Sequence, residues 1–175
     1  VVPEYMMLLR GVLDSPDIPL NVSRSYLQAD GNVKKISSHI SKKVAEKLEQ
    51  MYKNDKDEFI KKWDDLSIFI KYGMISDEKF YDRMSKVCQL KNTESNYFTF
   101  EEYKAKIETL QTDKNKKLVY LYANNTDEQF SYIKAAKDKG YDVLLMDGIL
   151  DNHFIQTLEH KFTDAKFARI DSETI

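Results

Sequence analysis

Several residue types are scarce in this chain, and each scarcity excludes a class of protein. The 175 residues include only 1 Cys, so neither an internal disulfide nor a cysteine-rich zinc site can form. No apolar run reaches the length of about 18 residues that a membrane-spanning helix needs. The formal net charge of −2 gives no general electrostatic reason to bind nucleic acid or an anionic membrane. We therefore expect neither nucleic acid nor membrane among the partners.

Glycine and proline are scarce too, with 5 Gly and 3 Pro. No two glycines fit the spacing G-x-G-x-x-G or G-x-x-x-x-G-K-[ST]. Loops that cradle a phosphate need glycine because the backbone N–H groups must approach the anion closely. The chain therefore lacks that kind of nucleotide pocket, and long uninterrupted helices are expected.

The residues that are present suffice for a folded core, with 42% apolar and 12% aromatic residues. The length predicts one domain or two small ones. The chain begins with Val1, and its apolar first residues have neither the basic start nor the cleavage site of a signal peptide. We expect a fragment of a longer protein.

The first half of the chain has helical periodicity. Apolar residues recur at steps of three or four over residues 23–52, and a second helix is predicted over 55–72 with Gly73 as its C-terminal cap. Trp63 belongs to the apolar stripe of the second helix, so we expect it in the core. A third helix is expected to start near Ser76 and to carry four buried residues, Phe80, Met84, Val87 and Cys88.

The last third alternates strands and helices. Strands are predicted over 118–122, 141–146 and 165–170, with helices after Thr126 and over 151–161. Thr99-x-x-Glu102 and Thr126-x-x-Gln129 both have the spacing of a capping box at a helix start. This order predicts a small parallel sheet. We expect an α/β protein with a helical segment in residues 1–95 and a small α/β/α sandwich with a three-stranded, mainly parallel sheet in residues 96–175.

Open parallel sheets bind ligands at the carboxyl ends of their strands, where Asp147 follows one strand and Asn124 and Asn125 follow another. Asp147 could be a phospho-acceptor in a stand-alone signalling or ligand-binding module, but that chemistry needs further carboxylates to hold magnesium, and a turn residue is the simpler interpretation. The three histidines form no metal motif, so we expect them to be structural: His39, His153 and His160.

A polar loop with two prolines, residues 14–24, leads to Arg24. An arginine is a permanently charged fork that matches phosphate oxygens, and Gln28 lies one helical turn further on. The alternative role for Arg24 is a surface salt bridge.

Residues 2–28, above all Arg10-Gly-Val-Leu-Asp-Ser15 and Leu20-Asn-Val-Ser-Arg24, closely resemble the signature of the heat-shock protein 90 chaperone family in its bacterial form. The segments 117–122 and 139–146 resemble the family's middle region more loosely. The resemblance implies the latter part of a middle domain, in which helices precede a small α/β/α sandwich. The family has Glu where this chain has Ser25, which removes a salt-bridge partner for the loop but leaves the Arg and Gln intact.

The resemblance also implies a function. In the family the ATP and magnesium site lies in a separate N-terminal domain, and a C-terminal domain forms the homodimer. The arginine matching Arg24 would contact the γ-phosphate of ATP, with the glutamine matching Gln28 at the same place. The implied protein is a cytoplasmic, ATP-hydrolysing chaperone of the stress response that binds unfolded client proteins, whereas this fragment would hold no cofactor and would be inactive alone.

Overall fold

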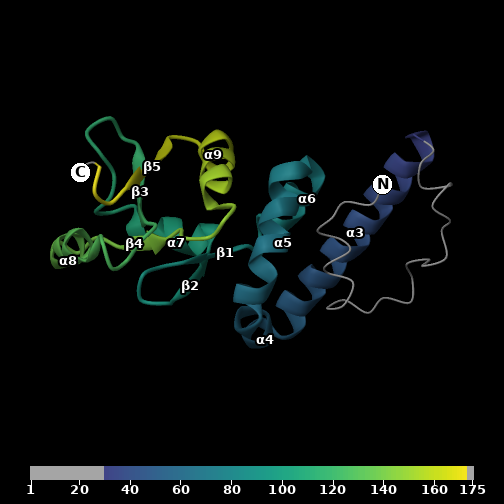
Figure 1. Cartoon of the computed structure of the whole chain (residues 1–175), viewed down its shortest axis with the longest axis horizontal. Helices are drawn as coiled ribbons and strands as arrows, with labels where there is room; N and C mark the ends of the chain where they lie inside the picture. Colours follow the sequence, from purple (N-terminus) through teal and green to yellow (C-terminus); the bar gives the residue numbers. More distant parts are fainter. Residues whose placement is uncertain (1–29, 173–175) are drawn as a thin grey trace. The chain divides into compact units, whose positions relative to one another are not determined.

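The computed structural model describes residues 30–172, with side chains from residue 38 onward (Figure 1). Two compact units divide the chain between Val87 and Cys88. This division lies earlier than the boundary expected after residue 95, because Leu90 pairs with Phe98 in a hairpin that joins the residues on both sides of the expected boundary.

The first unit is helical. It contains α3 (Asp30–Asn54), α4 (Lys56–Lys61), α5 (Trp63–Ser76) and α6 (Glu78–Met84). The predicted apolar stripes form its core, in which Leu48, Phe59 and Trp63 are almost completely buried. The Phe59 ring contacts Trp63 with 5.9 Å between ring centroids, and it meets Tyr52 of α3 edge to face at 5.4 Å.

The prediction of one helix over 55–72 with a cap at Gly73 was wrong. The Asp55 carboxylate accepts a hydrogen bond from the Glu58 N–H at 3.1 Å and starts α4, which ends at Lys61 before α5 begins. Helix α5 continues through Gly73 to Ser76. Asp77 follows, and its side chain accepts from the Phe80 N–H at 3.1 Å and thereby starts α6. Two aspartates thus set helix boundaries that apolar periodicity alone does not show.

The third helix is also shorter than predicted. It ends at Met84, so Val87 and Cys88 follow the helix instead of belonging to it. Both side chains are buried all the same, and the expectation that Cys88 is a small buried hydrophobe is confirmed.

The second unit begins with β1 (Gln89–Lys91) and β2 (Tyr97–Thr99), which pair antiparallel, and continues with α7 (Phe100–Ile107). Sequence patterning had not indicated β1. Then β3 (Leu118–Ala123), α8 (Phe130–Asp138), β4 (Val143–Leu145), α9 (Asp151–Lys161) and β5 (Ala165–Arg169) follow. The three-stranded sheet has the order β4-β3-β5 and is parallel throughout, which confirms the predicted fold class.

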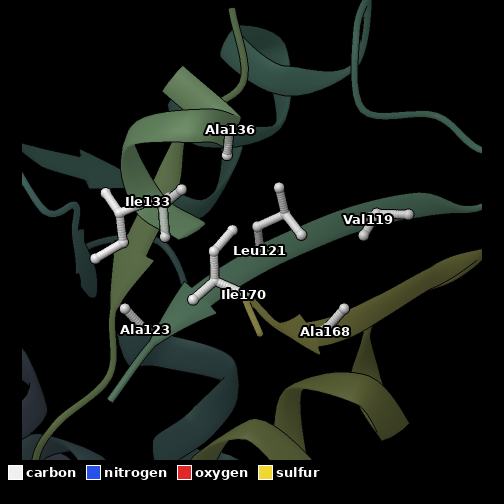
Figure 2. Close-up of a cluster of buried hydrophobic side chains, with 8 residues drawn as sticks. Val119, Leu121, Ala123, Ile133, Ala136, Ala168 and Ile170 are labelled. Atoms are coloured by element: carbon white, nitrogen blue, oxygen red, sulfur yellow. The ribbon is translucent and has the colours of Figure 1, made fainter. Parts of the chain in front are cut away.

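The two faces of this sheet bury different side chains. Val119, Leu121 and Ala123 of β3 meet Ile133 and Ala136 of α8 in an aliphatic cluster (Figure 2). The alternate residue Tyr120 lies in an aromatic cluster, where it stacks on Phe167 at 4.7 Å and contacts Tyr103 at 5.9 Å. Successive side chains of a strand point to opposite faces, so a single strand builds both clusters. Burial raises the pKa of Tyr120 to about 12.

The two predicted capping boxes have different outcomes. At Thr99 the box is formed, since the Thr99 hydroxyl accepts from the Glu102 N–H and the Glu102 carboxylate accepts from the Thr99 N–H at 2.8 Å. The prediction at Thr126 was wrong, because α8 begins only at Phe130 and has no side-chain cap. Gln129 turns its side chain back toward the end of β3 instead.

Candidate functional site

Arg24 and Gln28, the predicted phosphate contacts, lie outside the residues that the structure describes, and so does Ser25. The described part starts with α3 at Asp30. The geometry of the described residues can therefore be compared with the other predicted site, at the carboxyl ends of the parallel strands.

The loop after β4 is held by its own carboxylate. The Asp151 carboxylate accepts from the Gly148 N–H at 2.8 Å, and Asp151 is buried. A Cβ at Gly148 would lie 2.9 Å from the Asp151 oxygen, so a side chain at this position would require the buried carboxylate to move. Asp147 is exposed and precedes this turn.

The loop after β3 is filled by the Gln129 side chain. Its Oε1 accepts from the N–H groups of Asn124 at 3.0 Å and Asn125 at 3.1 Å. Its Nε2 donates to Asn124 Oδ1 at 2.9 Å and to Asp171 Oδ2 at 3.3 Å. Gln129 is only 5% exposed, and its amide bonds four groups of the loops. This loop therefore presents amides where phospho-acceptor chemistry would need carboxylates for magnesium.

Another carboxylate near this loop, Asp171, is paired with a cation. Arg169 Nε donates to Asp171 Oδ1 at 2.5 Å, and this hydrogen bond is the main cause that lowers the pKa of Asp171 and raises the pKa of Arg169. Within residues 38–172 no group of three or more His, Cys, Asp or Glu side chains could hold a metal ion. His39, His153 and His160 are all exposed.

A second polar cluster lies between the hairpin, α7 and β4, and the sequence did not indicate it. Asn92 is 1% exposed and donates from Nδ2 to both carboxylate oxygens of Asp142 at 3.2 and 3.3 Å. Buried Gln111 accepts from the Asp142 N–H at 2.6 Å and donates to the Val119 carbonyl at 2.9 Å. Burial and the Asp142 charge raise the pKa of Tyr103. These contacts attach the hairpin to the sheet and leave no exposed reactive group, so the cluster is structural.

Exposed apolar side chains in the second unit are the remaining candidates for contacts with another protein. Ile149 is 82% exposed, Phe130 66% and Leu110 53%. Met74, Met84 and Met146 are buried. The exposed residues are therefore aliphatic and aromatic. None of the helices in the described part is long and apolar enough to span a membrane.

Comparison with known proteins identifies relatives along the whole chain. Residues 1–175 match the family model described as Hsp90 protein. The chain is 58% identical over 175 residues to the chaperone protein HtpG of Bacteroides fragilis and 54% identical to that of Porphyromonas gingivalis, and it spans 26% of the length of each.

A solved structure has the same fold at low sequence identity. It is the middle domain of a Plasmodium falciparum heat shock protein, which superposes with a TM-score of 0.62 at 14% identity. The match covers 83% of this chain and 61% of that one.

Proposed function

The chain belongs to the Hsp90 protein family, and we propose that it is the middle-domain part of an ATP-dependent chaperone that binds unfolded client proteins. The observation that carries this proposal is the match of the family model to all 175 residues, with Arg24 and Gln28 both in place. The complete protein would work in the cytoplasm as a homodimer, through a C-terminal domain outside this chain.

In this proposal Arg24 contacts the γ-phosphate of ATP that a separate N-terminal domain holds, and Gln28 assists there. The arginine's permanent positive charge would stabilise the negative charge that develops during phosphoryl transfer. ATP and magnesium would both belong to the N-terminal domain. This agrees with the lack of a glycine-rich phosphate loop in the sequence and of a carboxylate group fit for magnesium among residues 38–172.

The test is Arg24→Ala in the full-length protein. ATP hydrolysis should fall about 10³-fold, as when an arginine finger is removed. ADP affinity should barely change, because ADP lacks the γ-phosphate. Arg83→Ala is a matched control, since Arg83 forms an ion pair with Glu49 in the helical unit and should leave hydrolysis unchanged. Unchanged hydrolysis in Arg24→Ala would contradict the catalytic role and would leave the chain a scaffold.

The client-binding part of the proposal is supported by the exposed Phe130 and Ile149. An exposed apolar side chain gains free energy when an unfolded chain covers it. In the same full-length protein, Phe130→Ser together with Ile149→Ser should weaken binding of an unfolded model protein and spare ATP hydrolysis. Equal client affinity in the double variant would exclude this surface.

The alternative function, a signalling module that is phosphorylated on Asp147, has less support because amides surround the neighbouring strand end. Incorporation of phosphate from a small phosphodonor, lost in Asp147→Asn, would favour this alternative.

A further inference from the structure

The two outer edges of the parallel sheet are covered differently. The outer edge of β4 is covered by the hairpin turn, where the Thr93 N–H donates to the Val143 carbonyl at 2.9 Å and Asn92 bridges to Leu144. Strand β5 forms the opposite edge, and within residues 30–172 it pairs only with β3. An edge strand of this kind presents backbone N–H and C=O groups that can pair with another chain.

The hydrogen bonds to β3 identify which groups of β5 face outward. The Leu118 N–H donates to the Asp164 carbonyl, and the Ile170 N–H donates to the Tyr122 carbonyl, both at 2.8 Å. Backbone groups of successive residues alternate between the two sides of a strand, so residues 164, 166, 168 and 170 face β3. The backbone groups of Ala165, Phe167 and Arg169 therefore face outward.

Side chains and a turn already occupy part of this outward edge. Glu159 of α9 accepts from the Phe167 N–H through Oε2 at 3.3 Å. The Arg169 carbonyl accepts from the Ser172 N–H at 2.9 Å and from its hydroxyl at 2.8 Å. The contact between Glu159 and the Phe167 N–H lies at the middle of β5. There the Glu159 carboxylate replaces the acceptor that a neighbouring strand would supply.

The outward groups of β5 are complementary to those of a second copy. In an antiparallel pair centred on Phe167, each Phe167 faces its counterpart and Ala165 faces Arg169 of the other copy. The outward groups of Ala165 and Phe167 and the outward N–H of Arg169 would then occupy hydrogen-bonded positions, and no like charges would face each other. The pair cannot form at its centre while Glu159 holds the Phe167 N–H.

We propose that Glu159 guards the sheet edge: by occupying the Phe167 N–H, it blocks antiparallel pairing of β5 with β5 of a second copy of this chain. The contact is an autoinhibitory device built into the fold, and it is independent of the chaperone activity proposed above. Charged side chains that protect edge strands are a known way for proteins to avoid association.

The test is self-association of the 175-residue chain with Glu159→Ala, measured by sedimentation over a range of concentrations. The paired form gains one hydrogen bond from each copy, so the association constant should rise at least about ten-fold over the wild type. Glu159→Gln should behave like the wild type, because its amide oxygen can still accept from Phe167. Glu108→Ala removes an exposed carboxylate elsewhere in the same unit and should also leave association unchanged.

A second substitution tests whether association uses β5. Arg169→Pro removes an outward N–H and spares the hydrogen bonds to β3, and proline is tolerated on an edge strand. Glu159→Ala with Arg169→Pro should associate no more than the wild type. Association that persists in this double variant would overturn the proposal, and so would a Glu159→Ala chain that keeps its native circular dichroism and the wild-type mass.

Amide hydrogen exchange gives a second measurement at concentrations too low for association. The Phe167 amide should exchange faster in Glu159→Ala than in the wild type or Glu159→Gln. Equal exchange in all three would show that Glu159 does not hold this amide and would overturn the proposal.

Discussion

In the helical unit Ser41 is the one buried polar side chain among the described residues, whereas the sandwich unit buries Gln89, Asn92, Thr99, Gln111, Gln129 and Asp151. A helix satisfies most of its backbone N–H and C=O groups internally, so helix packing requires mainly apolar surface. The short strands and loops of a small sheet leave backbone groups that need partners from side chains. This difference in buried polar side chains indicates that periodic apolar packing can stabilise the first unit, while the second unit also depends on specific buried amides.

The substitution with the largest expected effect tests apolar packing in the helical unit. Trp63→Ala should destabilise this unit by about 3–5 kcal/mol, because Trp63 is 2% exposed and its removal leaves a cavity beside Phe59. Amide hydrogen exchange of each unit is the measurement, and protection should fall in α3 to α6 first. Ile68→Ala on the same helix is the control, since Ile68 is 42% exposed and should cost less than about 1 kcal/mol. A similar loss in both variants would contradict the importance of the buried stripe.

A smaller effect tests the buried amides of the sandwich unit. Gln111→Leu should destabilise that unit by about 2–3 kcal/mol, because the Asp142 N–H and the Val119 carbonyl each lose a partner away from water. Urea unfolding followed by hydrogen exchange at β3 and β4 measures this. Gln156→Leu changes an exposed glutamine of the same unit and should have an effect near zero. If Gln111→Leu were equally silent, the contrast between the two units would fail.

The substitutions with the smallest expected effects compare the capping box that forms, at Thr99, with the one that only the sequence indicated, at Thr126. Thr99→Ala should cost about 1 kcal/mol, since the Thr99 hydroxyl accepts from the Glu102 N–H. Thr126→Ala should cost almost nothing, because α8 begins at Phe130 without a side-chain cap. Thermal unfolding of the two single variants compares them directly. Equal costs would mean that Thr126 has a role that the structure does not show.

Local sequence patterns predicted the helices and strands well where the signal lies within one segment of the chain. The helix over 151–161 was predicted from its regular apolar periodicity, and the three strands were predicted from short apolar stretches. The capping box at Thr99 was predicted for the same reason, since both of its hydrogen bonds join residues three apart.

The same local patterns were insufficient where a distant residue competes for a side chain. Gln129 has the right spacing from Thr126 for a capping box, but its amide bonds Asn124, Asn125 and Asp171, and Asp171 lies 42 residues away. The start of α5 is a similar case, because apolar periodicity continues across the break after Lys61. Strand β1 was missed because it is three residues long and gains its stability from β2 and β4.

For the candidate site, the family signature around Arg24 and Gln28 could be read from the sequence because the residues are consecutive. The cluster around Asp142 could not, since Asn92 and Asp142 are 50 residues apart and neither belongs to a motif. The hydrogen bond from the Phe167 N–H to Glu159 could not be predicted either, because it depends on where α9 places the carboxylate relative to the edge of β5.

The sequence by itself determined the kinds of element, the parallel β-α-β-α-β order and the family, because periodicity and a consecutive signature are local properties of the chain. Only the tertiary structure decided which helices break, which capping box forms, and which buried amides hold the sheet and its edges. The physical reason is that a side chain with two available partners takes the one that leaves the fewest buried polar groups unpaired, and that choice depends on residues far away in the sequence.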